Sequence, residues 1–312
     1  MVDPSPLKLA TRGSPLALAQ ANMIAAMVGQ PVELVTFSTR GDRTPGPLDR
    51  IGGKGLFTAE LEAALRTRQV HFAVHSAKDM PAAMADDLVI AAVPPREDAR
   101  DGLISLAGLS VAQLPPRGRV GTSSLRRSLQ LKAVRPDLQF LPLRGNVDTR
   151  LRKLREGQYD AIILAMAGMK RLGVFEQVRA MVQPMEVDGF VPAAGQGALA
   201  LQCLTDDAAT RAVLQRLSDP ASAAALAAER QVVHALGAGC QSALGVHIRP
   251  MAGEWCGDGM VADPSDGRII RLVVTGPTAP AVAQALTERL IERGARELLT
   301  KAEPSEREAE AG

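Results

Sequence analysis

The sequence is poor in aromatic residues and in cysteine. Its 312 residues include one Trp, one Tyr and six Phe, which are too few for the base-stacking surfaces that RNA-binding proteins use. The three cysteines, Cys203, Cys240 and Cys256, are too few and too scattered for a disulfide framework or a zinc site. We therefore expect no metal, and on composition alone each cysteine is expected to be a small buried side chain.

Long hydrophobic runs are also missing. The longest apolar run extends from about Ala161 to Met169, whereas a membrane span requires about 18 residues. The first residues, MVDPSPLKLATRGS, contain no apolar stretch of signal-peptide length. Because 46% of the residues are hydrophobic, the chain should form two or three compact domains. We expect a cytoplasmic protein without membrane contact.

Net charge is only +2, but the charge is unevenly distributed. Residues 117–179 contain 11 Arg and 3 Lys against 5 acidic residues, a balance of +9, so the rest of the chain carries −7. Arginine holds carboxylates and phosphates with two parallel hydrogen bonds, so this segment predicts a partner with several negative charges. A solvated face built from arginine-rich codon usage is the alternative, and composition does not separate the two.

Short strand-like runs alternate with helical patterns along the chain, which predicts an α/β fold. A glycine-dense connection, 39–57, is typical of a mobile lid. Proline-rich crossings at 94–100 and 184–192 and a change of character after Pro220 predict three domains. Strands are expected at 7–11, 32–37, 70–74, 88–93, 119–121, 139–143, 161–164, 245–248 and 269–274, and helices at 15–27, 57–66, 125–134, 147–156, 221–236 and 280–299.

Three polar motifs follow strand-like runs. In VHSAKDMP (74–81), an acid beside a base can shuttle a proton or stabilise a cation; the alternative is a surface Lys–Asp pair, and His75 is expected to be structural. VGTSSLRR (120–127) and LRGNVDTRL (143–151) each lead from a strand into a helix start, where free N–H groups and arginines favour an anion. Ordinary helix capping is the alternative. Together these motifs predict an anion-binding cleft at the carboxyl ends of parallel strands.

The turn GAGCQ (237–241) places Cys240 among glycines. A cysteine in such a loop can be accessible and can carry an attached group, whereas an inert buried thiol is the alternative.

Eight sequence blocks, in order and at suitable spacing over about nine-tenths of the chain, resemble the porphobilinogen deaminase family. They are ATRGSPLALAQ (10–20), GGKGLF (52–57), VHSAKDMP (74–81), VGTSSLRR (120–127), LRGNVDTRL (143–151), DAIILAMAG (160–168), PAAGQGAL (192–199) and AERQVVHALGAGCQ (228–241). Two departures occur: the cysteine turn reads Gly-Ala-Gly-Cys where the family pattern has two adjacent glycines, and Ala243 stands where it has proline.

The resemblance implies a transferase that joins four porphobilinogen molecules head to tail, loses ammonia at each addition and releases the linear tetrapyrrole hydroxymethylbilane by hydrolysis. It implies a dipyrromethane cofactor attached to Cys240 through a thioether, whose free pyrrole carbon attacks the azafulvene formed from each substrate. Asp79 matches the catalytic carboxylate. A chain of six rings carries about a dozen carboxylates, which would account for the arginine-rich segment.

The resemblance also assigns the remaining site residues and the architecture. The cofactor would be bound by Ser76, Lys78, Thr122, Ser124, Arg126, Arg127 and Arg150. The substrate would be bound by Arg12, Ser14, Gln20, Arg144, Arg150 and Gln196. The lid loop would include Lys54 and Phe57. Two domains resembling type II periplasmic binding proteins, 1–96 with 197–218 and 97–196, are expected with a small α+β domain, 219–312, that carries the cofactor cysteine. We expect a monomer that binds no nucleic acid.

Two other classes of protein are considered. A two-lobed anion-binding protein of the same fold would explain the cleft and the arginines, but it would explain neither the Cys240 turn nor the Asp79 motif. An RNA-binding protein would explain the arginines, but the sequence contains no recognition motif for it. No function is apparent for the unusual stretch Glu254-Trp255-Cys256-Gly257.

Overall fold

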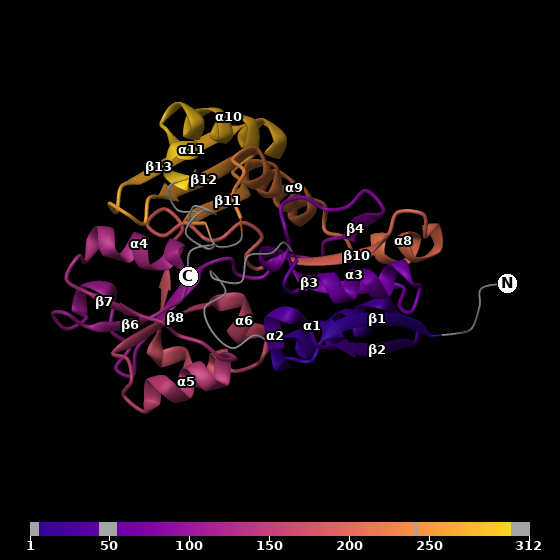
Figure 1. The fold of residues 1–312 in the computed structure, drawn as a ribbon, viewed down its shortest axis with the longest axis horizontal. Coiled ribbons are helices and arrows are strands. Elements are labelled where there is room, and N and C mark those ends of the chain that lie inside the picture. Colours follow the sequence, from indigo (N-terminus) through magenta and orange to yellow (C-terminus); the bar gives the residue numbers. More distant parts are fainter. Residues whose placement is uncertain (1–5, 44–54, 240–241, 301–312) are drawn as a thin grey trace, which may run out of the picture.

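In a computed structural model the described residues are 6–43, 55–239 and 242–300. They form three β-sheets with helices packed around them (Figure 1), which confirms the predicted α/β class. None of the helices within these ranges has the length and apolarity needed to cross a membrane.

The first sheet has the strand order β2-β1-β3-β10-β4. Strand β1 is parallel to β2 and β3, and β10 is antiparallel to β3 and β4. Helix α1 begins where the hydroxyl of Ser14 accepts a hydrogen bond from the N–H of Ala17, and it ends at Gly29, which is left-handed with φ 76°. The elements are β1 (Leu7–Arg12), α1 (Pro15–Val28), β2 (Val32–Phe37), α2 (Arg40–Arg43), α3 (Ala59–Arg66), β3 (Phe72–Ser76), the 3₁₀ turn η2 (Ala77–Asp79), β4 (Leu88–Ala92), β10 (Leu199–Leu204) and α8 (Ala208–Gln215).

The second sheet repeats this plan with the order β7-β6-β8-β5-β9. Strand β6 is parallel to β7 and β8, and β5 is antiparallel to β8 and β9. The central strand β8 is apolar and buried nearly throughout, as expected for a strand covered on both faces. The elements are β5 (Asp101–Ile104), η3 (Val111–Gln113), β6 (Arg119–Gly121), α4 (Leu125–Val134), β7 (Gln139–Leu141), α5 (Val147–Arg155), β8 (Ala161–Ala165), α6 (Met166–Arg171), α7 (Phe175–Val178), η4 (Arg179–Met181) and β9 (Val182–Met185).

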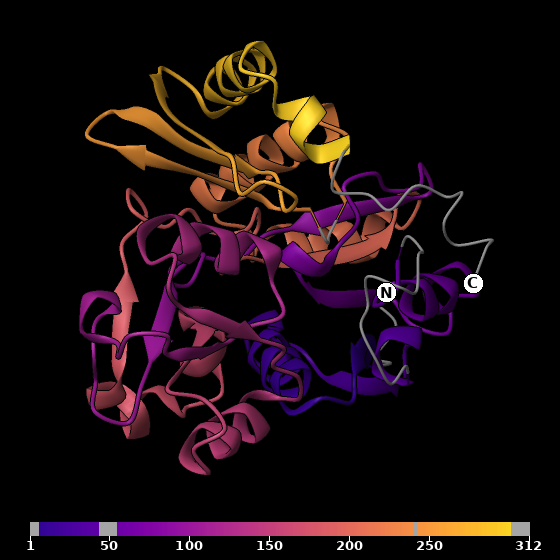
Figure 2. The same ribbon diagram turned by 60° about the vertical axis from the view of Figure 1, so that its left-hand side comes forward.

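The third sheet is an antiparallel meander, β11-β12-β13, with α9 and α10 packed against it. Figures 1 and 2 both place it above the junction of the other two sheets. Its core is formed by α9, α10 and the buried residues of the sheet. The elements are α9 (Pro220–Ala235), β11 (Leu244–Met251), β12 (Glu254–Ala262), β13 (Ile269–Gly276), α10 (Ala279–Glu292) and α11 (Ala295–Thr300).

The chain crosses between the first two sheets twice, and the two crossings lie side by side. The N–H of Glu97 donates to the carbonyl oxygen of Gly197 at 3.1 Å. A Cβ atom on Gly197, which has φ +85°, would lie 2.2 Å from the carbonyl oxygen of Glu97. Close backbone packing therefore requires glycine at this position.

A buried carboxylate links both crossings to the third sheet. Glu229 on α9 accepts hydrogen bonds from the Arg96 guanidinium (2.6 and 3.1 Å), the N–H of Gly195 (2.6 Å) and the N–H of Ile248 on β11 (2.8 Å). Burial alone would raise the pKa of Glu229, but the charge of Arg96 and the contact with His247 outweigh it and lower the pKa to about 2.

Several elements differ from the sequence-based expectation. The stretch 280–299 forms two helices instead of one, because Gly294 adopts a left-handed φ of +87° between them. The predicted crossing 184–192 begins too early, because Pro184 pairs within β9, an edge strand that tolerates proline. Strands β5, β9, β10 and β12 were not predicted, and β12 includes the unexplained stretch 254–257.

Candidate active site

Polar side chains predicted to form the site come from the carboxyl ends of strands in both large sheets. Arg12 ends β1 and Ser76 ends β3 in the first sheet. Thr122 follows β6 and Arg144 follows β7 in the second sheet. Because the parallel strands of one sheet end at the same edge, each sheet gathers its polar residues on one side.

Charged groups from the two sheets act on one another. Lys78 follows β3 of the first sheet. Its ammonium interacts electrostatically with Asp79, Arg127, Asp101 and Arg126. Desolvation lowers the pKa of Lys78 to about 8, and the neighbouring Asp79 opposes this effect. The Lys78 ammonium also lies 3.4 Å from the Gln196 side-chain oxygen. The predicted Lys78-Asp79 motif therefore faces the arginines of the second sheet.

Arg150 belongs to the same charged group. Desolvation and the charges of Arg127 and Arg144 together lower the pKa of Arg150 to about 10, and the charge of Asp79 opposes them. Within the described residues neither Arg144 nor Arg150 has a carboxylate at ion-pair distance, whereas Arg119, Arg135, Arg152 and Arg179 are each paired with an acidic residue. These two arginines are thus available to an anionic ligand.

Two helices begin at this edge with different caps. The side chain of Asn146 accepts a hydrogen bond from the N–H of Thr149 at 2.9 Å and caps α5 as predicted. Ser124 occupies the N-cap position of α4, but its side chain makes no capping hydrogen bond. Capping by the Ser124 side chain, which we expected whether or not a ligand binds there, is therefore wrong. The start of α4 keeps donors for a ligand.

Arg126 and Arg127 belong to the first turn of α4 and are buried, with exposed fractions of 4% and 8%. Both form ion pairs with Asp101, a residue that the sequence motifs did not identify. Burial would raise the pKa of Asp101, but the two guanidinium charges hold it well below its ordinary value. The Gln196 amide also donates to Asp101 at 3.0 Å.

Arg12 is held by two neighbours. Its guanidinium lies 4.2 Å from the centre of the Phe57 ring and forms an ion pair with Asp42 of α2. Asp42 also accepts hydrogen bonds from the N–H and hydroxyl of Thr39. A Cβ on Gly41 would lie 2.1 Å from the Phe57 ring, so this arrangement requires glycine there. Asp42 gave no signal in the sequence.

The other predicted residues have mostly structural contacts. Gln20 and Ser76 form reciprocal hydrogen bonds of 3.1 and 3.2 Å, and Ser14 caps α1. Thr122 accepts a hydrogen bond from the N–H of Ser124. His75 is buried against Gln202, and desolvation lowers its pKa to about 4, so it is neutral and structural as predicted. Cys240 and Lys54 lie outside the described residues.

The residues that flank Cys240 in sequence face the same region. Gly239 and Ser242 line a cavity of about 70 Å³ together with Lys78, Met80 and Arg230. Gly239 and Ser242 therefore lie on the same cavity as Lys78. The two other cysteines, Cys203 and Cys256, are buried, and burial raises the pKa of both thiols, that of Cys203 to about 11.

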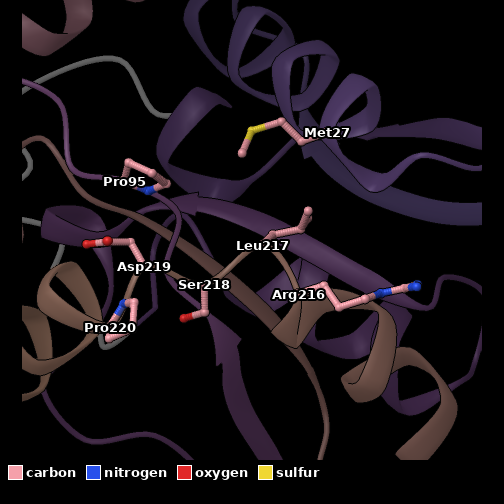
Figure 3. A pocket seen from close by; sticks show the side chains of 7 residues that line it. All are labelled: Met27, Pro95, Arg216, Leu217, Ser218, Asp219 and Pro220. Carbon is pink, nitrogen blue, oxygen red and sulfur yellow. The ribbon is translucent and has the colours of Figure 1, made fainter.

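A second hollow, of about 410 Å³, lies elsewhere (Figure 3). It is bounded by Met27, Pro95 and the 216–220 segment and contains none of the predicted site residues. Within the described ranges, no group of three His, Cys, Asp or Glu side chains could hold a metal ion.

Comparison with known proteins gives a consistent result. Residues 7–212 match the family model "Porphobilinogen deaminase, dipyromethane cofactor binding domain". The porphobilinogen deaminase of Roseiflexus castenholzii is 45% identical over 301 residues, covering 94% of this chain and 98% of its own, and that of Campylobacter curvus is 44% identical, covering 95% and 97%. Among solved structures, the aliphatic sulphonate binding protein SsuA of Escherichia coli is 16% identical with a TM-score of 0.39, covering 74% of this chain and 70% of its own.

The fold and this group of charged side chains define an α/β protein in which cations from the two large sheets interact with one another. With a family model that covers two-thirds of the chain and relatives of this identity, the chain belongs to the porphobilinogen deaminase family. It is a transferase, a hydroxymethylbilane synthase of tetrapyrrole biosynthesis with a dipyrromethane cofactor. The family membership, reaction and cofactor predicted from the sequence are confirmed.

Proposed function

We propose that Cys240 carries the dipyrromethane cofactor through a thioether and that Asp79 is the catalytic carboxylate. The observation that carries this proposal is that Asp79 interacts electrostatically with two cations, Lys78 and Arg150. The charge of Arg127 acts on both of these cations. A carboxylate at this position can stabilise positive charge that develops on the substrate. The donor set also matches the acetate and propionate groups of linked pyrroles.

The cofactor is proposed to lie between the cysteine turn and the start of α4. Its carboxylates would be held by Lys78, Ser76, Thr122, Ser124, Arg126, Arg127 and Arg150. The uncapped start of α4 adds backbone N–H donors, and the ion pairs of Arg126 and Arg127 with Asp101 fix both guanidinium groups in place. When bound, the dipyrromethane supplies the nucleophilic pyrrole carbon.

Asp79 acts on the incoming porphobilinogen. Its carboxylate would accept hydrogen bonds from the protonated aminomethyl group and the pyrrole N–H, and stabilise the positive charge that spreads over the ring as the C–N bond breaks and ammonia leaves. Since positive charge appears on the ring only as the C–N bond breaks, its stabilisation lowers the barrier to reaction more than it strengthens binding.

The substrate carboxylates are proposed to contact Arg12, Ser14, Gln20, Arg144, Arg150 and Gln196, with Lys54 and Phe57 beside them. Asp42 occupies the Nε and one terminal nitrogen of Arg12, so the opposite edge of the guanidinium remains for substrate. Ser14 accepts a hydrogen bond as the cap of α1, which leaves its hydroxyl hydrogen to donate.

The enzyme is proposed to act as a cytoplasmic monomer that binds no nucleic acid or membrane. We further propose three domains: 1–96 with 197–218, 97–196, and 219–312. The placement of each sheet within one of these groups of residues supports this division.

Intact-protein mass, measured on the wild type and on Cys240→Ser, tests the attachment site. The wild type is expected to carry the additional mass of two linked pyrroles, and Cys240→Ser is expected to lack it. Cys256→Ser is the matched control, because this buried thiol should have no part in attachment and the variant should keep the additional mass. If Cys240→Ser keeps the adduct, Cys240 is not the anchor. If wild type incubated with porphobilinogen carries none, the proposed site is wrong.

A further inference from the structure

Asp101, the first residue of β5, is completely buried and lies where three predicted ligand-binding side chains meet. One carboxylate oxygen, Oδ1, accepts hydrogen bonds from Nε (3.1 Å) and a terminal nitrogen (2.6 Å) of Arg127 and from the Gln196 amide (3.0 Å). The other, Oδ2, accepts from Arg126 at 2.8 Å. This single carboxylate therefore touches two proposed cofactor ligands and one proposed substrate ligand.

We infer that Asp101 is the positioning residue that sets the orientation of Arg126, Arg127 and Gln196 for the reaction. The inference rests on the proposed function of these three residues. Because Asp101 has no exposed surface, it does not touch substrate or cofactor itself. It acts through the side chains that it holds.

Charge balance explains why such a residue is needed. Arg126 and Arg127 are adjacent, both are buried, and their like charges repel. One carboxylate placed between them offsets one of the two charges, so the group keeps a net charge of +1. A buried charge without a partner is costly, and the carboxylate of a bound ligand would complete the balance.

The hydrogen bonds leave room for that ligand. Each guanidinium has five N–H donors. Within the described part of the chain, Arg126 donates to Asp101 and to the carbonyl oxygen of Val191, and Arg127 donates to Asp101 twice and to the carbonyl oxygen of Ile163. Half of the N–H groups of the pair are thus fixed by protein atoms, and the other half remain for ligand carboxylates.

The same carboxylate connects the cofactor side of the cleft with the substrate side. Gln196 donates to Asp101 and to the carbonyl oxygen of Ala99, while its own side-chain oxygen faces Lys78. Asp101 follows the first crossing and Gln196 lies on the second. A change in the position of either crossing would therefore be transmitted to the arginine pair.

A double-mutant cycle of Asp101→Asn and Arg127→Gln tests this inference, with kcat/KM for porphobilinogen as the readout. Asp101→Asn keeps the shape of the side chain and removes its charge, and it is expected to lower kcat/KM about 100-fold through misplacement of the arginines. In the Arg127→Gln background the same change should cost less than about 10-fold, because its principal partner is already gone.

Asp258→Asn is the matched control. Asp258 is also a buried aspartate in an ion pair, with Arg249 on the third sheet, but it contacts none of the three positioned side chains. It should change kcat/KM by less than about threefold in both backgrounds, additively with Arg127→Gln. Equal losses for Asp101→Asn in the two backgrounds would show a purely structural role and overturn the inference.

Intact mass separates failure of this inference from failure of the proposed function. If the wild type carries no two-pyrrole adduct, the proposed function fails. If the adduct is present and Asp101→Asn retains wild-type kcat/KM, only the role of Asp101 fails. If Asp101→Asn does not fold, the double variant is expected to fold, because it keeps the net charge of +1. If Arg127→Gln folds and the double variant does not, Asp101 is needed for folding of the core, and the inference is overturned.

Discussion

Desolvation of the Lys78 ammonium can be tested by measuring how the stability of the protein depends on pH. Its pKa is lowered from 10.5 to about 8 in the folded protein, so between these two values the unfolded chain binds more protons. Stability therefore rises as the pH increases through this window. In the cofactor-free Cys240→Ser background, a change from pH 7.5 to 10 should stabilise the protein by about 2 kcal/mol more than it stabilises Lys78→Met.

Thermal unfolding of the two proteins at both pH values measures this difference. All other titrating groups are the same in the pair, so their effects cancel in the comparison. Equal changes in Tm would mean that the Lys78 ammonium is as well solvated in the folded protein as in the unfolded chain.

The sequence predicted the site residues that belong to motifs, but not the residues that hold them. Lys78, Asp79 and Arg127 stand in recognisable blocks after strands. Asp101 and Asp42 are single acidic residues that belong to none of the recognised motifs. Their arginine partners are at least 25 and 30 residues away, respectively. Ion pairs at such separation depend on how the sheets come together, which local patterns do not encode.

The starts of α4 and α5 show how two similar strand-to-helix motifs divide between stability and binding. Asn146→Ala removes a capping hydrogen bond and is expected to cost about 1 kcal/mol, or a few degrees in Tm. Ser124→Ala removes no such bond, so its Tm in the cofactor-free Cys240→Ser background should remain within about 1 °C.

Ligand binding should show the opposite order. Ser124→Ala is expected to weaken retention of the cofactor or lower kcat, measured by intact mass and steady-state rates, while Asn146→Ala affects these less. If the two variants lose equal stability, Ser124 is an ordinary cap and the anion site at α4 is wrong.

At the level of elements, regular strands and helices were predictable and packing-dependent ones were not. Helices α1 and α5 follow from their capping residues, Ser14 and Asn146, and from apolar spacing. Strand β12 contains Gly257 and Gly259, and glycine is uncommon within strands. Their Cβ atoms would lie 2.5 Å from Val282 and 2.8 Å from Leu286 of α10. The glycines are present because a helix packs closely on the strand, and this contact is invisible in the local sequence.

For the whole molecule, the buried Arg96–Glu229 pair is expected to stabilise the folded arrangement of the three sheets. Glu229→Gln leaves Arg96 buried without a charge partner and should cost about 3 kcal/mol or more at pH 7. Because the folded pKa of Glu229 is lowered to about 2, this stabilisation is present above pH 4.5 and is lost as the pH falls toward 2. The Tm difference from wild type should therefore shrink on acidification.

Glu186→Gln is the control for this comparison. Glu186 also pairs with an arginine, Arg100, but its side chain is 67% exposed, so its removal should change the Tm little at any pH. A similar loss for both variants at pH 7 would show that the position of Glu229 at the junction adds nothing to the stability of the pair.

The two crossings between the large sheets have a consequence for synthesis of the protein. Strand β10 lies between β3 and β4 in the first sheet, although it is separated from β4 by the entire second sheet in the sequence. A growing chain therefore cannot complete its first sheet until Leu204 has left the ribosome. The second sheet is made from the continuous stretch Asp101 to Met185. All strands of the second sheet are therefore available for pairing before the first sheet can be completed.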